Sequence, residues 1–382
     1  MLEIQPFPGI RYDRDGVELG RVLAPPYDVI SPAMRDELYA RDPHNIVRAV
    51  LNRTPGESGY VEAGETLHAW EKEGVLRREA TPALYVLEQT FTEGERTFRR
   101  LGLMARFRAE DPERGIILPH EQTRKAAKED RWRLLQTTQA NFSPIFLMFP
   151  DPGARFAALT ADTLEQPTLA HVTDDGGVDH RLWRVDDATR IAEWQGFLGD
   201  TKAYIADGHH RHATALRWRD EHGPDGAWTF GYLTPMESPG LLVLPYHRIL
   251  EEGPSLEAAT PRLAEHFEVS RVPDPGSAAA AVAESKARWA FALAEPGHGG
   301  LVAESRPSAE TLLPDDAPAC LRALDPYLLH HGVLGPLLDI PDTAVSYVHS
   351  LAEAEKAVEK GACRLAALLR GTPVQQLSLI HI

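Results

Sequence analysis

The stretch YIADGHHRHATAL (residues 204–216) has an apolar, strand-like start and a helix-like end on either side of one glycine. We predict a strand over 202–206 and a helix over 209–219, joined at Asp207 and Gly208. Packing alone gives little reason to gather a carboxylate, three histidines and an arginine at such a junction. The pattern therefore favours a functional site.

The chemistry of this junction suits an anion such as phosphate. The first turn of a helix has unpaired N–H groups and a partial positive charge, and a glycine before it lets the backbone approach an anion closely. Gly208 holds that position, while His209, His210 and Arg211 add donors suited to phosphate oxygens. Asp207 would repel phosphate unless it holds Mg²⁺ or accepts a proton, so the combination predicts phosphoryl chemistry.

Other interpretations of the same residues stay open. Asp207 is also a good helix cap, and histidines near a helix start are often surface residues or satisfied core groups. His209 and His212 are three residues apart and hence on one helical face, so with Asp207 they are a candidate metal site.

Away from this junction, strand-like and helix-like periodicity alternate, which predicts an α+β fold of mixed sheets with peripheral helices. A hairpin is expected from residues 82–91 and 97–108, and a buried strand from 143–149. We place an N-terminal lobe at 1–160 and a C-terminal lobe with the junction at 161–382. One continuous domain is the alternative.

Composition bounds the class of protein. The chain has 382 residues, of which 43% are hydrophobic and 25% charged, as in ordinary globular proteins. Its 40 basic and 56 acidic side chains give a net charge of −16, which weighs against nucleic acid as a partner. Without an apolar run long enough for a membrane span and without a signal peptide, the sequence predicts a cytoplasmic protein. Cys320 and Cys363 lack metal-ligand spacing and are expected to be small core residues.

Two other stretches carry candidate substrate-binding residues. Tyr27 and Asp28 follow a Pro-Pro pair that fixes the backbone, which suits either substrate positioning or a rigid structural turn. His247 and Arg248 follow an apolar strand, where the pair is suited to bind a carboxylate or a phosphate, or to form a structural ion pair.

Four motifs together resemble the prokaryotic domain-of-unknown-function family number 1015. They are VLAPPYDVIS (22–31), HEQTRKAAKEDRWRLLQTTQANFSPIF (120–146), YIADGHHRHATAL (204–216) and GLLVLPYHRIL (240–250). The resemblance runs from about residue 4 to residue 377. Within it, the DGHHR element is similar to the phosphate-binding box of the ParB/sulfiredoxin superfamily, and most closely to that of archaeal ADP-dependent free serine kinases.

This resemblance implies a strand-loop-helix phosphate box and a nucleotide cofactor, either ADP or ATP, with Mg²⁺. Gly208, His209, His210 and Arg211 would cradle the phosphates, with Thr214 on the first turns of the helix. Asp207 would orient the loop or a metal.

The serine kinases use a separate glutamate to activate the substrate hydroxyl, and no motif match identifies its counterpart. Our candidate is Glu121, which follows an apolar strand end together with His120 and Thr123, both candidates for substrate binding. Asp207 and His209 are the other catalytic candidates. The competing interpretation is that Glu121 is an exposed carboxylate at a helix start, favoured by the helix dipole.

Together these patterns predict a nucleotide-dependent phosphotransferase acting on a small hydroxyl compound, with free L-serine as the first substrate to test. The partners are then a small molecule and a nucleotide. Two alternatives stay open, a non-catalytic ParB-like nucleotide-binding switch and a metal-dependent phosphate-ester hydrolase. Members of the family that this chain resembles continue with a Lys- and aromatic-rich end, whereas this chain stops at SLIHI (378–382). We therefore expect a truncated C-terminus whose last five residues are foreign.

Overall fold

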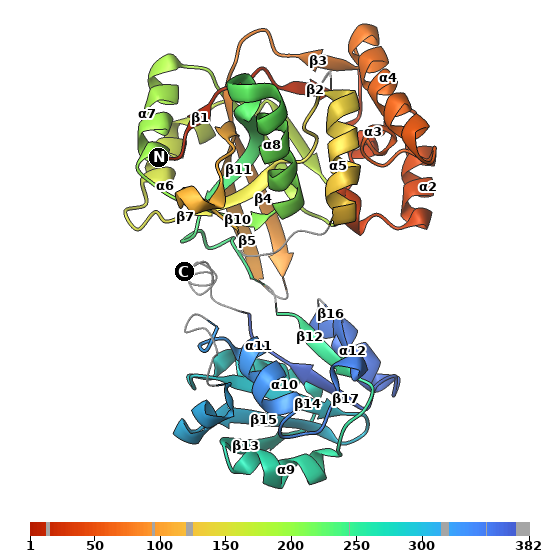
Figure 1. Cartoon of the computed structure of the whole chain (residues 1–382), viewed down its shortest axis with the longest axis vertical. Coiled ribbons are helices and arrows are strands. Elements are labelled where there is room, and N and C mark those ends of the chain that lie inside the picture. Colours follow the sequence, from red (N-terminus) through yellow and green to blue (C-terminus); the bar gives the residue numbers. More distant parts are fainter. Residues whose placement is uncertain are drawn as a thin grey trace. The chain divides into compact units, whose positions relative to one another are not determined.

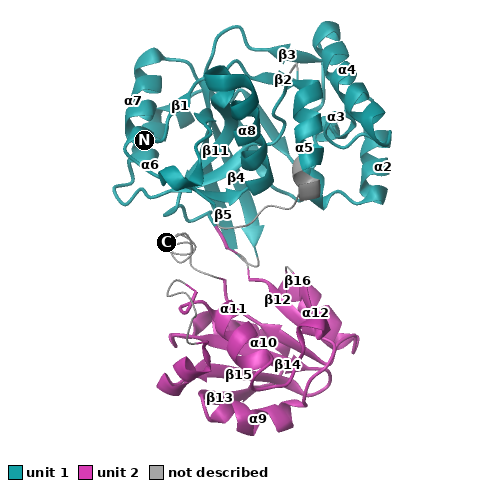
Figure 2. Cartoon of the chain, viewed as in Figure 1, with its two compact units in different colours: residues 1–241 teal, residues 242–382 magenta. Residues whose placement is uncertain are grey.

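The structure is a computed structural model of the whole chain. It describes residues 1–12, 16–93, 96–119, 125–243, 245–314, 321–348 and 350–371. The chain has two compact units, residues 1–241 (unit 1) and 242–382 (unit 2), which Figure 2 shows in different colours. This division differs from the predicted lobes, whose boundary at residue 160 lies inside a helix of unit 1 (Arg155–Leu164).

Unit 1 is built on a mixed sheet (Figure 1). Its strands are β1 (Ile4–Gln5), β4 (Leu84–Glu93), β5 (Arg96–Arg108), β6 (Ile117–Leu118), β7 (Ile145–Phe149), β8 (Ala170–Thr173), β9 (Asp179–Val185), β10 (Ala203–Asp207) and β11 (Trp228–Pro235). Over the described residues their order is β6-β10-β7-β11-β5-β4-β9-β8, with β1 paired to β5. A separate antiparallel pair consists of β2 (Ile10–Tyr12) and β3 (Leu76–Arg78).

Parallel and antiparallel pairings occur side by side in this sheet. β10 runs parallel to β6 and antiparallel to β7, while β11 runs parallel to β7 and antiparallel to β5. β4 and β5 form the predicted hairpin, in which Phe91 is opposite Phe98 and the two rings stack at 5.8 Å. The predicted α+β class with mixed sheets is confirmed.

Helices surround the sheet of unit 1. They are α1 (Leu19–Val22), α2 (Pro32–Arg41), α3 (Val47–Val50), α4 (Glu57–Glu73), α5 (Lys125–Thr138), α6 (Arg155–Leu164), α7 (Ala188–Gly199) and α8 (His209–His222), with short 3₁₀ turns η1 (Tyr27–Val29), η2 (Pro112–Arg114) and η3 (Gly223–Ala227). Ser31 starts α2 because its hydroxyl accepts the Met34 N–H at 3.2 Å. Helix α5 lies between α4 and α8 (Figure 1), an arrangement that builds the pockets described below.

One core joins the two sides of the predicted lobe boundary. Its buried residues extend from Leu2, just before β1, to Leu233 in β11 and include side chains of α6 and α7. Phe156 of α6 meets Trp194 of α7 edge to face, with ring centroids 5.1 Å apart. Because α6 packs into this shared core, the residues on both sides of position 160 belong to one unit.

Unit 2 is an antiparallel sheet with helices. Its strands are β12 (His247–Leu250), β13 (Phe267–Val272), β14 (Ala290–Glu295), β15 (Gly299–Ser305), β16 (Val345–Val348) and β17 (Leu365–Leu368), in the order β13-β15-β14-β17-β12-β16 over the described residues. Its helices are α9 (Leu256–Ala264), α10 (Pro275–Glu284), α11 (Asp325–Leu328) and α12 (Leu351–Glu359), with the short turns η4 (Pro307–Leu312) and η6 (Asp342–Ala344) and the π-helix η5 (Leu329–Leu334).

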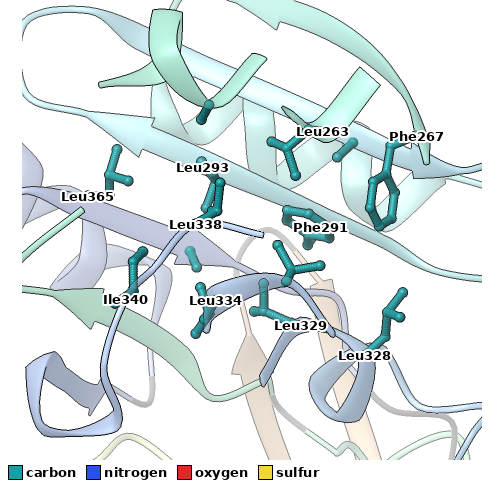
Figure 3. Packing of buried hydrophobic residues seen from close by; sticks show 14 of the residues in the cluster. Leu263, Phe267, Phe291, Leu293, Leu328, Leu329, Leu334, Leu338, Ile340 and Leu365 are labelled. Carbon is teal, nitrogen blue, oxygen red and sulfur yellow. The ribbon is translucent and has the colours of Figure 1, made fainter. Parts of the chain in front are cut away.

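Both faces of the unit 2 sheet are covered by apolar side chains. Figure 3 shows the larger cluster, where Phe267 and Phe291 meet edge to face at 5.2 Å beside the leucines of η5. Alternate residues of β14 point the other way, so Ala290 and Ala292 pack against α10 and α12. Burial of one phenylalanine or leucine stabilises the fold by roughly 1.5–3 kcal/mol, and the two clusters together hold the unit.

The predictions made from composition and from the chain end have different outcomes. Cys363 is a free, partly buried cysteine beside the second cluster of unit 2, and Cys320 lies outside the described residues. Within the described ranges, no helix combines the length and the apolar character needed to cross a membrane. The C-terminal segment 378–382 also lies outside the described residues, and the cytoplasmic location stays a prediction.

Candidate functional site

The predicted strand-to-helix junction is present in unit 1. β10 ends at Asp207, α8 begins at His209, and Gly208 joins them with φ +95° and ψ 29°. That left-handed conformation suits glycine and is strained for other residues. The Gly208 carbonyl accepts the first helical hydrogen bond, from the His212 N–H at 2.9 Å. No side chain among the described residues caps the start of α8.

Arg211 covers this glycine. Its guanidinium donates to the Asp207 carboxylate and to the Pro144 carbonyl, which joins α8 to the end of β10 and to the start of β7. A Cβ on Gly208 would lie 3.0–3.2 Å from the guanidinium group of Arg211. The Asp207 side chain is 64% exposed, that of Arg211 only 18%. The open cradle expected from the sequence is therefore closed by an arginine that already holds a carboxylate.

The three histidines of the junction have different surroundings. His209 and His212 are buried, and the His212 ring stacks on Phe107, with centroids 6.5 Å and planes 9° apart. Burial lowers the pKa of His212 to about 4, so this imidazole is neutral at pH 7. The Nδ1 atom of His210 is buried and has no hydrogen-bond partner among the described residues.

The alternative metal site does not form from these residues. Within the described parts of the chain, no three histidine, cysteine, aspartate or glutamate side chains are grouped to hold a metal ion. Asp207 instead forms an ion pair with Arg211, so its carboxylate would meet a cation only after Arg211 releases it. A role for Asp207 in binding Mg²⁺ stays a prediction.

A pocket of about 50 Å³ lies next to the junction, and we name it the arginine pocket. Two arginines line it, Arg211 from α8 and Arg131 from α5, together with Thr214. The Thr214 hydroxyl donates to the His210 carbonyl at 2.9 Å, which leaves its oxygen able to accept. The other residues that line the arginine pocket are Tyr27, Val50, Leu134, Leu135, Ala140, Asn141, Phe142, Ser143 and Ala215.

Tyr27 enters this pocket from a distant part of the sequence. The guanidinium carbon of Arg131 lies 3.9 Å from the centroid of the Tyr27 ring, a cation–π contact. Burial raises the pKa of the Tyr27 hydroxyl, and the positive charge of Arg131 partly opposes that rise. The structure thus brings Tyr27 beside the junction, whereas its neighbour Asp28 is exposed.

Arg131 is a residue that the sequence analysis does not single out. Its side chain is only 10% exposed, and its Nε donates to Asp130 Oδ2 at 2.7 Å. Leu134 and Leu135 follow three and four residues later and line the same pocket, so Arg131 shares a helix face with two leucines. The signal in the sequence that could have identified Arg131 is a basic residue on a helix face that otherwise carries leucines.

A second pocket, of about 200 Å³, adjoins the arginine pocket, and we name it the α4 pocket. The two pockets share Val50, Arg131 and Leu134. The rest of the α4 pocket comes from α3, the loop before α4, the first turns of α4, and α5. These residues are Ala49, Leu51, Asn52, Thr54, Pro55, Gly56, Gly59, Tyr60, Ala63 and Asp130.

The remaining candidates do not join these pockets in the described structure. His120, Glu121 and Thr123 lie outside the described residues. His247 and Arg248 are on β12 in unit 2 and line neither pocket.

His247 and Arg248 instead have surroundings typical of packed strand residues. His247 Nδ1 accepts the Leu369 N–H at 3.2 Å, and the Arg248 guanidinium donates to the Tyr246 carbonyl and lies 5.3 Å from the Tyr347 ring. Burial lowers the pKa of both His247 and Arg248. No carboxylate among the described residues acts on either side chain, so the alternative of a structural ion pair is not seen there.

Comparison with known proteins gives a family and distant structural similarities. The family model described as "Protein of unknown function (DUF1015)" matches residues 4–327. No curated protein matches the chain.

Among solved structures, a free serine kinase mutant in complex with AMP is 14% identical and covers 69% of this chain and 77% of that chain, with a TM-score of 0.32. A free serine kinase mutant in complex with ADP is 14% identical, covers 70% and 79%, and has a TM-score of 0.32. A conserved hypothetical protein from Pyrococcus furiosus is 15% identical, covers 69% and 80%, and has a TM-score of 0.30. TM-scores this low leave the function to be argued from the site itself.

Proposed function

The chain belongs to the DUF1015 family, and we propose that it is a nucleotide-dependent phosphotransferase that acts on a small hydroxyl compound. The observation that carries this proposal is the arginine pocket, which Arg131 and Arg211 both line beside the first turns of α8. Two guanidiniums next to a helix N-terminus favour a polyanionic ligand such as the phosphates of a nucleotide. ADP and ATP are the proposed donors, and free L-serine is the first acceptor to test.

Both guanidiniums have donors left for a ligand. A guanidinium has five N–H donors, and the bonds to Asp130 and Asp207 use only part of them. A phosphate carries more negative charge than the Asp207 carboxylate and can accept two parallel bonds, so it would compete for Arg211. Once Arg211 turns towards phosphate, the backbone at Gly208 becomes open to the same anion.

The chemical step requires positioning more than covalent help from the protein. The acceptor hydroxyl oxygen bonds to the terminal phosphorus, the bond from that phosphorus to the bridging oxygen breaks, and the nucleotide leaves one phosphate shorter. The hydroxyl proton passes to a carboxylate, for which Glu121 is our candidate, with Asp207 and then His209 as alternatives. Asp207, once released from Arg211, is also the candidate ligand of Mg²⁺, which would neutralise charge on the phosphates.

The test is a nucleotide and acceptor screen on the purified full-length chain. Calorimetric titration with AMP, ADP and ATP, with and without Mg²⁺, measures binding, and single-turnover assays with L-serine and other small alcohols measure transfer. Formation of a phosphorylated acceptor supports the proposal. Nucleotide binding without transfer indicates the ParB-like switch instead, and release of phosphate to water indicates the hydrolase.

Substitution of Glu121 tests the proposed base. Glu121→Gln keeps the size of the side chain but cannot accept a proton at neutral pH, so turnover should fall by about 10²–10⁴ while nucleotide affinity stays nearly intact. Glu113→Gln, which changes an exposed carboxylate in η2, is the matched control. Equal single-turnover rates in Glu121→Gln and the parent would shift the role to Asp207.

A further inference from the structure

The proposed function assigns no ligand to the α4 pocket, which shares a wall with the arginine pocket. Val50, Arg131 and Leu134 belong to both, so a ligand in the α4 pocket lies next to any group held in the arginine pocket. Its volume of about 200 Å³ exceeds that of the arginine pocket, about 50 Å³. This pairing of a small anion pocket with a larger neighbour is what a transfer between two ligands requires.

The loop that forms one wall of the α4 pocket is held firmly in place. Asn52 Oδ1 accepts the Thr54 N–H at 2.7 Å, and Asn52 Nδ2 donates to the Arg48 carbonyl at 3.1 Å. The loop packs so closely on α4 that a Cβ on Gly59 would lie 2.1 Å from the Thr54 carbonyl oxygen. The pocket is therefore already formed without a ligand, which lowers the cost of binding.

The opposite wall presents one negative and one positive side chain. Tyr60 donates its hydroxyl to Asp130 Oδ1 at 2.7 Å, while Asp130 Oδ2 accepts from Arg131. Burial and the Asp130 carboxylate raise the pKa of Tyr60 to about 12, so at neutral pH its hydroxyl keeps its proton and orients Asp130. A carboxylate has about four lone-pair sites and a guanidinium five donors, so both groups can bind a further ligand.

We propose that the α4 pocket binds the phosphoryl acceptor as a small zwitterion, an α-amino acid with a hydroxyl, whose ammonium contacts Asp130 and whose carboxylate contacts Arg131. The inference rests on the proposed function and names the acceptor site within it. A nucleobase is a poorer match, because it is uncharged and Tyr60 supplies the one aromatic ring among the described residues that line the pocket. The pocket offers a charge pair where a nucleobase would need stacking surface.

Asp130→Asn tests the ammonium contact while keeping an acceptor for Tyr60. In calorimetric titration of the full-length chain, this variant should bind L-serine about ten- to a hundredfold more weakly and ADP within about twofold of the parent. The control is Glu129→Gln, one residue earlier on α5, whose carboxylate pairs with Arg133 and Arg217 and lines neither pocket. It should change neither affinity.

A second probe removes the charge from the ligand instead of the protein. N-acetyl-L-serine lacks the ammonium, so it should bind the parent and Asp130→Asn equally weakly. Equal L-serine affinity in Asp130→Asn and the parent, or no L-serine binding by the parent at millimolar concentration, overturns the inference even where transfer to another acceptor is found. If L-serine binding depends on Asp130 but no phosphoryl transfer is found, the inference about the α4 pocket is supported. The proposed function is then wrong.

Discussion

Side chains cap the first backbone N–H groups of helix α12 in unit 2, whereas no described side chain caps those of helix α8 in unit 1. At α12, the Ser350 hydroxyl accepts the Glu353 N–H and the Glu353 carboxylate accepts the Ser350 N–H, both at 3.2 Å. At α8, Gly208 has no side chain, and none of the described residues supplies a cap. A capping box uses the donors of a helix start for folding, whereas an uncapped start keeps them for another partner.

The same contrast extends over the chain. Side-chain oxygens accept first-turn N–H groups at most helix starts of eight residues or more that the structure describes, namely those of Ser31, Asp151, Asp187, Ser255, Asp274 and Ser350. The exceptions within those described starts are α8 and α4, and α4 begins at Gly56 with φ +70°. Gly56 lines the α4 pocket and Gly208 adjoins the arginine pocket. Among these described helix starts, the two without a cap are the two beside the pockets.

Three ion pairs differ in the exposure of their carboxylates, which is low for Asp325 and higher for Asp130 and Asp207. In unit 2, Asp325 is 11% exposed and accepts from Arg370 Nε at 2.6 Å, and Arg370 also donates to backbone carbonyls from Ser285 to Arg288. In unit 1, the pairs of Arg211 with Asp207 and of Arg131 with Asp130 line or adjoin pockets. We infer that the first kind holds the fold and the second kind serves a ligand.

The largest expected effect comes from Arg370→Met in unit 2. Removing one partner of a buried pair leaves an uncompensated carboxylate at Asp325, which should lower the free energy of unfolding by about 3–5 kcal/mol. Nucleotide affinity of the folded protein should not change. Guanidinium unfolding followed by circular dichroism measures the loss, and hydrogen exchange assigns it to unit 2.

The control for that experiment is Arg262→Met, which removes an exposed pair with Asp339 in the same unit. An exposed pair contributes about 0–1 kcal/mol, so this variant should unfold nearly as the parent does. Should Arg370→Met weaken nucleotide binding as strongly as it weakens unit 2, the separation of structural pairs from ligand-binding pairs would be wrong.

Arg211→Ala tests an ion pair of the second kind, the one that adjoins the arginine pocket. Loss of a charge-assisted contact to phosphate should reduce nucleotide affinity by about 1.5–3 kcal/mol, which is roughly ten- to a hundredfold in Kd. Stability should fall by only about 1 kcal/mol, because Asp207 is 64% exposed and returns to water, while the Pro144 carbonyl loses one donor. Arg217→Ala, six residues later on α8 and outside both pockets, is the matched control in calorimetric titration. Unchanged nucleotide affinity in Arg211→Ala would leave the junction without its proposed role.

Gly208→Ala separates backbone strain from ligand binding. A left-handed conformation costs an alanine about 1–2 kcal/mol relative to glycine, so unit 1 should be destabilised by that amount. The new Cβ, 3.0–3.2 Å from the guanidinium of Arg211, should also displace this arginine and alter nucleotide affinity. Gly74→Ala has the same strain at φ +79° with open space around its Cβ. Thermal unfolding should respond to both substitutions, and calorimetric titration with ADP only to the first.

Much of the fold was accessible from the sequence because it depends on local signals. The hairpin of β4 and β5 follows from alternating apolar residues, and the start of α2 follows from Ser31 and Pro32. The strand and helix around Gly208 lie within a few residues of the predicted bounds. The unit boundary was not accessible, because it depends on which strands share a core, and the strands of unit 1 extend from Ile4 to Pro235.

The site was accessible only in part, for a similar reason. The junction at Gly208 carries its own local pattern, whereas the pocket beside it needs Tyr27, Arg131 and Arg211 from three distant segments. Nothing within α5 tells which neighbour its arginine will meet. The closed state of the junction was also missed, since the sequence does not indicate that Arg211 would hold Asp207 and cover the glycine.

The smallest effect is expected from loss of the cap at the start of α12. Ser350→Ala removes the oxygen that accepts the Glu353 N–H, and loss of such a cap costs about 1 kcal/mol. Ser350→Thr keeps the acceptor and should restore most of that stability in the same unfolding measurement. Neither substitution should change nucleotide affinity, because this helix start uses its donors for folding. A change in ADP binding on loss of this cap would show that capped and uncapped helix starts do not divide structure from function in this protein.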